Sequence, residues 1–337
     1  MPSPVIVLGI ESSCDETAAS VLVDGVVRSN VVASQDVHRQ WGGVVPELAS
    51  RAHQEHIVPV VDQALNEAGV AGKDLSAVAF TQGPGLIGAL LVGTCFARSY
   101  AQALGKPLVA VDHMQAHVLA HFIQDGEDRA VPTFPFINLT VSGGHSLIVL
   151  VRSPLDMEVI GTTLDDAAGE AFDKGAKVLG LPYPGGPLID LHSRTGDPRT
   201  YKLPSPNIEG FNMSFSGVKT AFNNIVRRGL LQDPDFVVQE LPHLCASLQQ
   251  CIIDILLRKV HKAGRTLGIP RITMSGGVSA NAALRDQLKQ LGEREGWQVW
   301  IPPFAYCTDN GAMIAMAGHF QFLAGYTAPL DVVPHAR

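Results

Sequence analysis

The sequence predicts a mixed α/β protein made of two lobes built on the same plan, with a cleft between them. A strand, a polar turn and a second strand are expected over residues 5–23, and the same pattern returns over 136–151, roughly 130 residues later. Apolar strand-like runs alternate with helical patterns along the chain. With 337 residues, 46% apolar and 17% charged, the chain can bury two hydrophobic cores, and its 33 glycines and 22 prolines indicate many tight turns.

The first half is expected to open with two strands around the polar turn 11–17 and a third strand after the tight turn Asp24-Gly25. A helix begins at Pro46, which suits a first helical turn, and its His53 and His56 are interpreted as surface groups. The glycine-rich turn 82–88 is not a Walker loop, because no Gly-Lys-Ser/Thr follows. The expected elements are strands over 5–10, 18–23, 26–33, 75–81 and 107–111, and helices over 46–68, 89–104 and from 113 onward.

In the second half, two strands run into glycine-containing junctions at 142–144 and 275–277, where backbone N–H groups can approach an anion. The proline-rich stretch 182–187 and the irregular stretch 202–215 are interpreted as loops. The expected elements are strands over 136–141, 146–151, 271–274 and 297–301, and helices over 163–179, 241–263 and 312–324, with a further helix after Asn281.

Two histidines indicate a metal site. His113 and His117 are four residues apart on a helix that Asp112 is expected to cap, so both imidazoles lie on one face. Asp309, at the head of the last helix, is the candidate carboxylate that completes the set. The alternatives are two histidines on a half-exposed helix face and an aspartate that only caps a helix. Met114 stands where a zinc protease has its catalytic glutamate, so the helix lacks that base.

The polar turns have weaker signals. Asp15 and Glu16, at the tip of the first strand pair, could face a phosphate or a metal, or could form a solvated hairpin end. Ser142-Gly143-Gly144 suits an anion, although Gly-Gly turns are common.

Charge and cysteine content limit the function classes. The net charge of −7 gives no global footprint for nucleic acid, so an RNA partner would need a local basic patch or a basic partner subunit. The five cysteines are scattered without a C-x-x-C motif, which indicates reduced thiols. No signal peptide or membrane span is apparent, so the expectation is a soluble cytoplasmic protein with no membrane partner.

Taken together, the motifs resemble one family, in order, from about residue 5 to 320. The run 105–118, Gly-Lys-Pro-Leu-Val-Ala-Val-Asp-His-Met-Gln-Ala-His-Val, looks like the signature once called glycoprotease. The whole set is similar to the TsaD family of bacterial tRNA N6-adenosine threonylcarbamoyltransferases. The other matching motifs lie at 9–17, 42–51, 83–86, 141–145, 165–174, 183–187, 214–220, 275–281 and 307–311.

The resemblance implies a two-lobed actin-like ATPase (ASKHA) fold with duplicated strand–turn–strand cores around a central cleft. The N-terminal lobe would span 1–130, with the closing helix 312–325 packing back on it, and the C-terminal lobe 131–311. The resemblance also implies a reaction. The threonylcarbamoyl group of threonylcarbamoyl-adenylate passes to N6 of adenosine 37 in tRNAs that read codons starting with A, and AMP is released.

Site roles are likewise implied by the resemblance. His113, His117 and Asp309 would bind one iron (Fe²⁺) or zinc ion, and Asp15 and Glu16 would be the cleft-facing catalytic acids. The residues implied in substrate binding are the phosphate and carbamoyl turn (Thr140, Val141, Ser142, Gly143, Gly144), Asp173 on the ribose, Gly186 on the nucleoside, Asn281 on the adenine side, and Asp190 as a ligand-contacting acid.

Other classes of function match the sequence less well. Met114 disfavours a metalloprotease, and paired histidines are wrong for the magnesium of a small-molecule kinase. An inactive scaffold paralogue should lack part of the ligand set. A carbamoyltransferase of the same fold is the closest alternative, but its relatives carry long extra domains. The resemblance also implies a TsaB-like paralogous subunit and a TsaE-like small ATPase as partners, besides tRNA.

Overall fold

The computed structural model describes residues 3–35, 38 and 41–336, and these residues form two compact units. The first unit comprises Met1–Pro132 and Pro302–Arg337, and the second comprises Thr133–Ile301. The segment 302–311, which carries Asp309, therefore lies in the first unit, whereas the sequence analysis placed it in the second. It belongs there because it leads directly into helix α9 (Gly311–Leu323), which packs on the first sheet.

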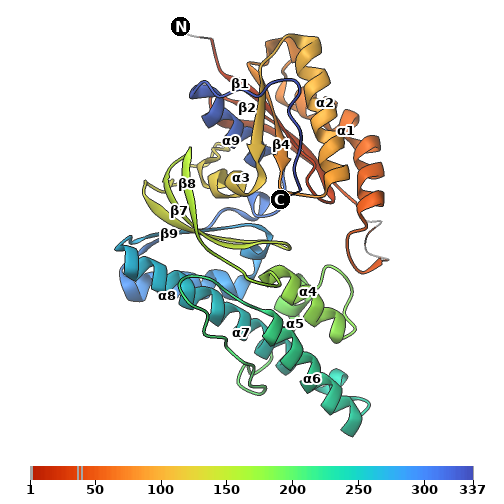
Figure 1. Ribbon diagram of the computed structural model, residues 1–337, viewed down its shortest axis with the longest axis vertical. Helices are drawn as coiled ribbons and strands as arrows, with labels where there is room; N and C mark the ends of the chain where they lie inside the picture. The colour runs from red at the N-terminus through yellow and green to blue at the C-terminus, as the bar shows by residue number, and fades with distance from the viewer. Residues whose placement is uncertain (1–2, 36–37, 39–40, 337) are drawn as a thin grey trace. The chain divides into compact units, whose positions relative to one another are not determined.

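The first unit is built on a five-stranded sheet in the order β3-β2-β1-β4-β5 (Figure 1). The β1, β2 and β3 strands are antiparallel neighbours, whereas β4 and β5 continue the sheet from β1 in parallel. Asp24 and Gly25 have φ values of 51° and 79°, so the expected tight turn between β2 and β3 is present. The strands are β1 (Ile6–Glu11), β2 (Glu16–Val23), β3 (Val26–Ser34), β4 (Ala77–Gly83) and β5 (Leu108–Asp112).

Helices cover both faces of this sheet. Helices α1 (Pro46–Ala68) and α2 (Ile87–Leu104) pack on one face, with α1 against β2 and α2 against β4. Helix α9 contacts β1, β2 and β4, and the short helix α3 (His113–Leu119) packs against α9. The approach of α9 is so close that a Cβ on Gly9 of β1 would stand 2.3 Å from the Ala315 nitrogen. The close packing fixes the position of the loop that precedes α9.

The second unit repeats the topology of the first. Its sheet has the order β10-β9-β6-β7-β8, with three antiparallel neighbours and two parallel additions. The repeat expected from the sequence is therefore present, together with a third antiparallel strand, β8, that was not expected. The strands are β6 (Phe136–Val141), β7 (Ser146–Ser153), β8 (Asp156–Thr162), β9 (Arg271–Ser275) and β10 (Gln298–Trp300).

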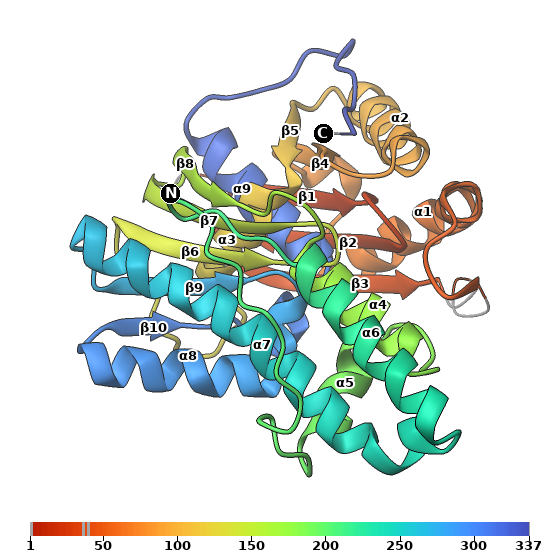
Figure 2. The same ribbon diagram turned by 60° about the horizontal axis from the view of Figure 1, so that its bottom comes forward.

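The helices of the second unit are labelled in Figure 2. Their buried residues form one hydrophobic cluster with alternate residues of β6. The α6 helix was not expected from the sequence. The helices are α4 (Ala168–Val178), α5 (Gly186–Ser193), α6 (Ser216–Gln232), α7 (Phe236–Leu267) and α8 (Ala282–Glu295). Among the described residues, none of the helices combines the length and apolarity needed to cross a membrane.

Several boundaries differ from the sequence prediction: helix α7, for example, extends beyond the predicted 241–263 at both ends. Two of the differences have local reasons. Helix α4 starts at Ala168 rather than at 163, because Asp165 accepts hydrogen bonds from the backbone N–H groups of Phe215 and Ser216 instead of continuing a helix. The stretch 182–187 is a loop only in part, since α5 already begins at Gly186.

Candidate metal centre and anion-binding turns

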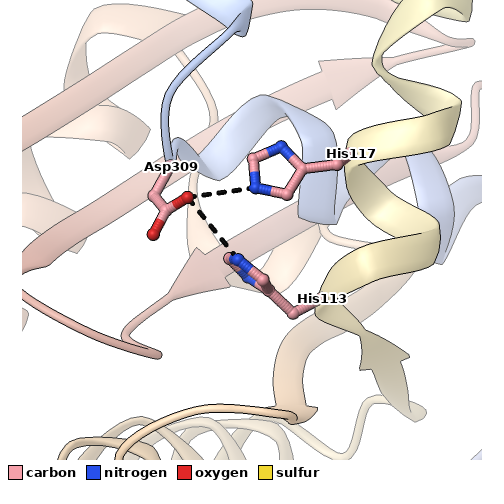
Figure 3. Close-up of side chains that lie close together, drawn as sticks. All are labelled: His113, His117 and Asp309. Carbon is pink, nitrogen blue, oxygen red and sulfur yellow. Dashed lines mark hydrogen bonds and ion pairs between the residues drawn. The ribbon is translucent and has the colours of Figure 1, made fainter. Parts of the chain in front are cut away.

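His113, His117 and Asp309 lie together in the first unit (Figure 3). The two histidines come from one face of α3, and the aspartate comes from the loop before α9. The Oδ1 atom of Asp309 is 3.1 Å from Nε2 of His117 and 3.5 Å from Nε2 of His113. His117 is fully buried and His113 nearly so. The prediction that these three side chains lie close together is confirmed.

Local capping explains why Asp309 is available. Asp112 accepts a hydrogen bond from the N–H of Gln115 and so caps α3, as expected. Helix α9 is capped by Asn310, whose side chain accepts from the N–H of Met313. Asp309 is therefore not the cap of α9, and its carboxylate can face the histidines.

The arrangement fits a transition-metal ion. Donor atoms that each lie about 2.0–2.2 Å from one ion at near-tetrahedral angles are about 3.3–3.6 Å apart. The Asp309 oxygen lies close to this separation from each of the two imidazole nitrogens, and all three ligand atoms lie within 4.8 Å of one another. Two imidazole nitrogens and a carboxylate oxygen form a donor set used for zinc and for non-haem iron. The Nδ1 atom of His117 is buried and has no hydrogen-bond partner within the described part of the chain.

A second layer of polar groups surrounds His113. Glu11, at the end of β1, is fully buried, and its Oε2 lies 3.0 Å from Nδ1 of His113. Burial alone would raise the pKa of Glu11, but the charge of His113 and its hydrogen bond lower it. Burial likewise would lower the pKa of His113, but the carboxylates of Glu11 and Asp309 raise it to about 9. The sequence analysis did not single out Glu11.

The predicted catalytic acids belong to the same unit. Asp15 and Glu16 lie at the turn between β1 and β2 and are partly exposed. Burial, together with the neighbouring carboxylates of Asp309 and Asp15, raises the pKa of Glu16 to about 10. Several acids thus crowd the ligand cluster, and a bound cation would favour their ionised forms.

His53 occupies a place that the sequence analysis did not anticipate. It was interpreted as a surface group, yet it is fully buried beneath the β1–β2 turn. One ring nitrogen lies 2.7 Å from the Thr17 hydroxyl, and the other lies 3.0 Å from the Cys14 carbonyl oxygen. Burial lowers its pKa. The surface interpretation was wrong because the partners of His53 lie more than 30 residues away in sequence, at the turn that it braces.

In the second unit, the predicted phosphate turn divides into a buried part and an exposed part. Thr140 and Val141 are fully buried in β6, whereas Gly143 and Gly144 are exposed. The backbone N–H of Ser142 donates to the carbonyl of residue 145, which closes the turn. A Cβ on either glycine would meet nothing within 4 Å. Packing does not demand glycine there, which leaves room for a ligand close to the backbone.

The turn rests on a neutral polar network. Asn138 is fully buried and accepts hydrogen bonds from the hydroxyls of Thr140 and Ser275 at 2.5 and 3.1 Å. Its amide nitrogen donates to Thr273 at 2.8 Å. The network joins β6 to β9 where these strands lead into the two glycine-containing junctions.

Asp173, Gly186 and Asp190 lie at helices α4 and α5. The Oδ1 atom of Asp173 accepts from the N–H groups of Gly185 and Gly186 at 2.8 and 3.2 Å, so this carboxylate holds the start of α5. Burial raises its pKa. A Cβ on Gly186 would be 3.9 Å from its nearest neighbour, so packing does not require this glycine. Asp190 lies 3.6 Å from Arg194 one turn along α5.

Asn281 has a structural task. Its Oδ1 caps α8 by accepting from the N–H of Leu284, and its amide donates to Gln249 at 2.7 Å. A contact of Asn281 with adenine stays a prediction.

Comparisons with known proteins connect these features to one family. The family model for tRNA N6-adenosine threonylcarbamoyltransferase (TsaD) matches residues 26–316. A protein of that name from Cytophaga hutchinsonii is 55% identical over 333 residues, which is 99% of this chain and 96% of the relative. Another from Porphyromonas gingivalis is 52% identical over 338 residues, covering 100% of this chain and 99% of the relative.

Solved structures show the fold alone. The HypF structure from T. kodakarensis is 14% identical, with a TM-score of 0.62, over 98% of this chain and 50% of HypF. A full-length HypF in a phosphate- and nucleotide-bound form gives 12% identity and a TM-score of 0.61, over 94% of this chain and 46% of HypF. These likenesses and the repeated sheet topology confirm the predicted actin-like ATPase fold. The chain belongs to the TsaD family of tRNA N6-adenosine threonylcarbamoyltransferases.

Proposed function

We propose that this protein transfers the threonylcarbamoyl group of threonylcarbamoyl-adenylate to N6 of adenosine 37 in tRNAs that read codons starting with A. The observation that carries the proposal is the near full-length similarity to named threonylcarbamoyltransferases. In the reaction the N6 amine attacks the carbamoyl carbon, the bond from that carbon to the phosphate oxygen breaks, and AMP leaves. The alternative, a carbamoyltransferase, is not favoured, because the near full-length relatives are named threonylcarbamoyltransferases.

In the first unit, we assign His113, His117 and Asp309 as ligands of one iron or zinc ion. Such an ion supplies Lewis-acid stabilisation of negative charge when bound. The choice between iron and zinc stays open to metal analysis, because both accept this donor set.

The acids of the β1–β2 turn have the proton-handling role. The adenosine amine must lose a proton as it forms the new bond, and a carboxylate within reach can accept it. We assign this role to Asp15. Its neighbour Glu16 has a pKa of about 10 and so holds a proton near neutral pH in the absence of a cation.

In the second unit, we assign Ser142, Gly143 and Gly144 to the phosphate and carbamoyl groups. The support is their exposed backbone and the open space around both glycines. Asp173 is assigned to the ribose hydroxyls through Oδ2, the oxygen that does not receive the α5 backbone.

The net charge of −7 gives the chain little general attraction for tRNA phosphates. We therefore propose that it works with partners, a TsaB-like actin-fold subunit and a TsaE-like small ATPase, in the cytoplasm where tRNA is modified.

The test is reconstitution. Purified chain receives threonylcarbamoyl-adenylate and unmodified tRNA, with and without the two partners, and modified nucleosides are counted by mass spectrometry over time. We expect multiple turnover with the partners and poor turnover without them. Full activity of the isolated chain would contradict the partner requirement, and no modified adenosine under either condition would contradict the proposed reaction.

A further inference from the structure

Glu11 is a buried acid that the proposed reaction leaves without a role. It ends β1, the central strand of the first sheet, and its side chain is fully buried. Buried carboxylates are costly unless hydrogen bonds satisfy them, so its contacts indicate what it does.

Three donors surround the Glu11 carboxylate. Oε1 accepts the backbone N–H of Ser13, and Oε2 accepts the hydroxyl of Thr81 at 2.7 Å. Oε2 also lies 3.0 Å from Nδ1 of His113. The Ser13 hydroxyl is 3.2 Å from the same ring nitrogen. With the strand end, the β1–β2 turn and β4 all contributing, the carboxylate is held on several sides.

This arrangement fixes which His113 nitrogen carries hydrogen. An ionised carboxylate can only accept, so Nδ1 of His113 must donate to it. In the neutral ring Nε2 then has a lone pair, and Nε2 is the atom that faces Asp309 at 3.5 Å. A histidine that donates one ring N–H to a carboxylate is held in the orientation and tautomer that a metal needs.

The second histidine lacks comparable support. No described residue provides a hydrogen-bond partner for the buried Nδ1 of His117. The ligand pair is therefore unequal, and His113 is the ligand that the protein orients.

We propose that Glu11 is a positioning residue that holds His113 as an Nδ1–H tautomer, with Nε2 directed at the bound ion. The inference rests on the proposed metal site. It adds a residue from β1, about one hundred positions earlier in the chain, to the three ligands.

Glu11→Gln tests the inference with little change in volume. A glutamine has one acceptor oxygen for three donors, so its NH₂ group must face one of them. Where it faces His113, it drives the hydrogen to Nε2 and removes the ligand lone pair. Ser20→Ala is the matched control, because it removes one buried hydrogen bond of the same sheet, from Ser20 to the Ser29 carbonyl, away from the histidines.

The first readout is Zn²⁺ affinity, measured by competition with a chromophoric chelator. We expect Glu11→Gln to bind Zn²⁺ about 10–100-fold more weakly than wild type, the usual effect of losing such a partner, and Ser20→Ala to bind like wild type. The second readout is ¹⁵N NMR of the imidazoles in Zn²⁺-loaded wild type. We expect the Nδ1–H proton of His113 to resonate well downfield of that of His117, because among the described residues only His113 donates its Nδ1–H to a carboxylate, and this result does not depend on whether the variant folds.

The outcomes separate the two claims. Equal affinity of wild type and Glu11→Gln, or matching Nδ1–H shifts for His113 and His117, would overturn the role of Glu11 and leave the metal site intact. Wild type that binds Zn²⁺ no better than His113→Ala/His117→Ala would overturn the metal site and the inference together.

Discussion

The two units have the same sheet topology but opposite chemistry where their central strands end. In the first unit, β1 ends in a buried carboxylate beside buried histidines, with two further acids on the following turn. In the second unit, β6 ends in buried hydroxyl and amide groups, followed by exposed glycines. The first arrangement suits a cation, and the second suits an anion that approaches a backbone.

The duplicated fold therefore determines where functional residues lie but not which chemical groups they carry. In both units, the turn between the first two strands and the carboxyl ends of the parallel strands lie at the same end of the sheet. Charged groups at that edge need partners when buried, and the first unit provides them as ion pairs. The second unit satisfies its buried groups with neutral hydrogen bonds, which leaves the turn free of negative charge. Substitutions that remove the ion pairs should therefore affect the first unit alone. Substitutions that remove the neutral hydrogen bonds should affect the second unit alone.

The largest stability effect should come from the neutral network. Asn138→Ala leaves the buried hydroxyls of Thr140, Thr273 and Ser275 without their shared partner, and we expect the second unit to lose about 2–3 kcal/mol. Native-state hydrogen exchange of the β6 and β9 amides measures this locally. The exposed Asn224→Ala on α6 is the control, with a change within about 0.5 kcal/mol. Unchanged exchange in Asn138→Ala would mean that the network does not stabilise the sheet.

A smaller effect, on binding alone, should come from Asp173. Asp173→Asn keeps an oxygen for the N–H groups of Gly185 and Gly186 but replaces the other acceptor with an NH₂ group. We expect AMP affinity, measured by calorimetry, to fall by about 1–2 kcal/mol because the ribose hydroxyls lose their acceptor.

Asp173→Ala provides the comparison, since it also removes the support of α5 and should affect both stability and binding. If Asp173→Asn binds AMP as tightly as wild type, Asp173 does not contact the ribose.

Much of the architecture could be predicted from local pattern. Apolar runs located the strands of both sheets except β8, and the bounds of α1 matched the prediction, Pro46–Ala68. The spacing of His113 and His117 indicated a shared face because helix geometry is local. The strand β8 was missed because it is an edge strand with several exposed residues. Helix α6 was missed although its apolar residues recur at helical spacing, as at Val218, Phe222 and Ile225.

The supporting residues of the site could not be predicted this way. Glu11 contacts His113 across 102 positions, and Asn138 contacts Ser275 across 137. The side chain of Lys259 on α7 donates to the carbonyls of Ile208 and Gly210, about 50 positions earlier, and so holds the 202–215 loop. Residues so far apart in sequence become neighbours only through the tertiary fold. The local pattern of residues along the chain does not specify those contacts.

The central claim is that the cation belongs to the first unit and is held by His113, His117 and Asp309. Metal analysis of purified wild type, His113→Ala/His117→Ala and Asn138→Ala tests it most directly, with circular dichroism to verify folding. We predict about one equivalent of iron or zinc in wild type and in Asn138→Ala, and loss of the metal from the folded double-histidine variant, because two of its three ligands are gone. A full equivalent retained by the double-histidine variant would contradict the account.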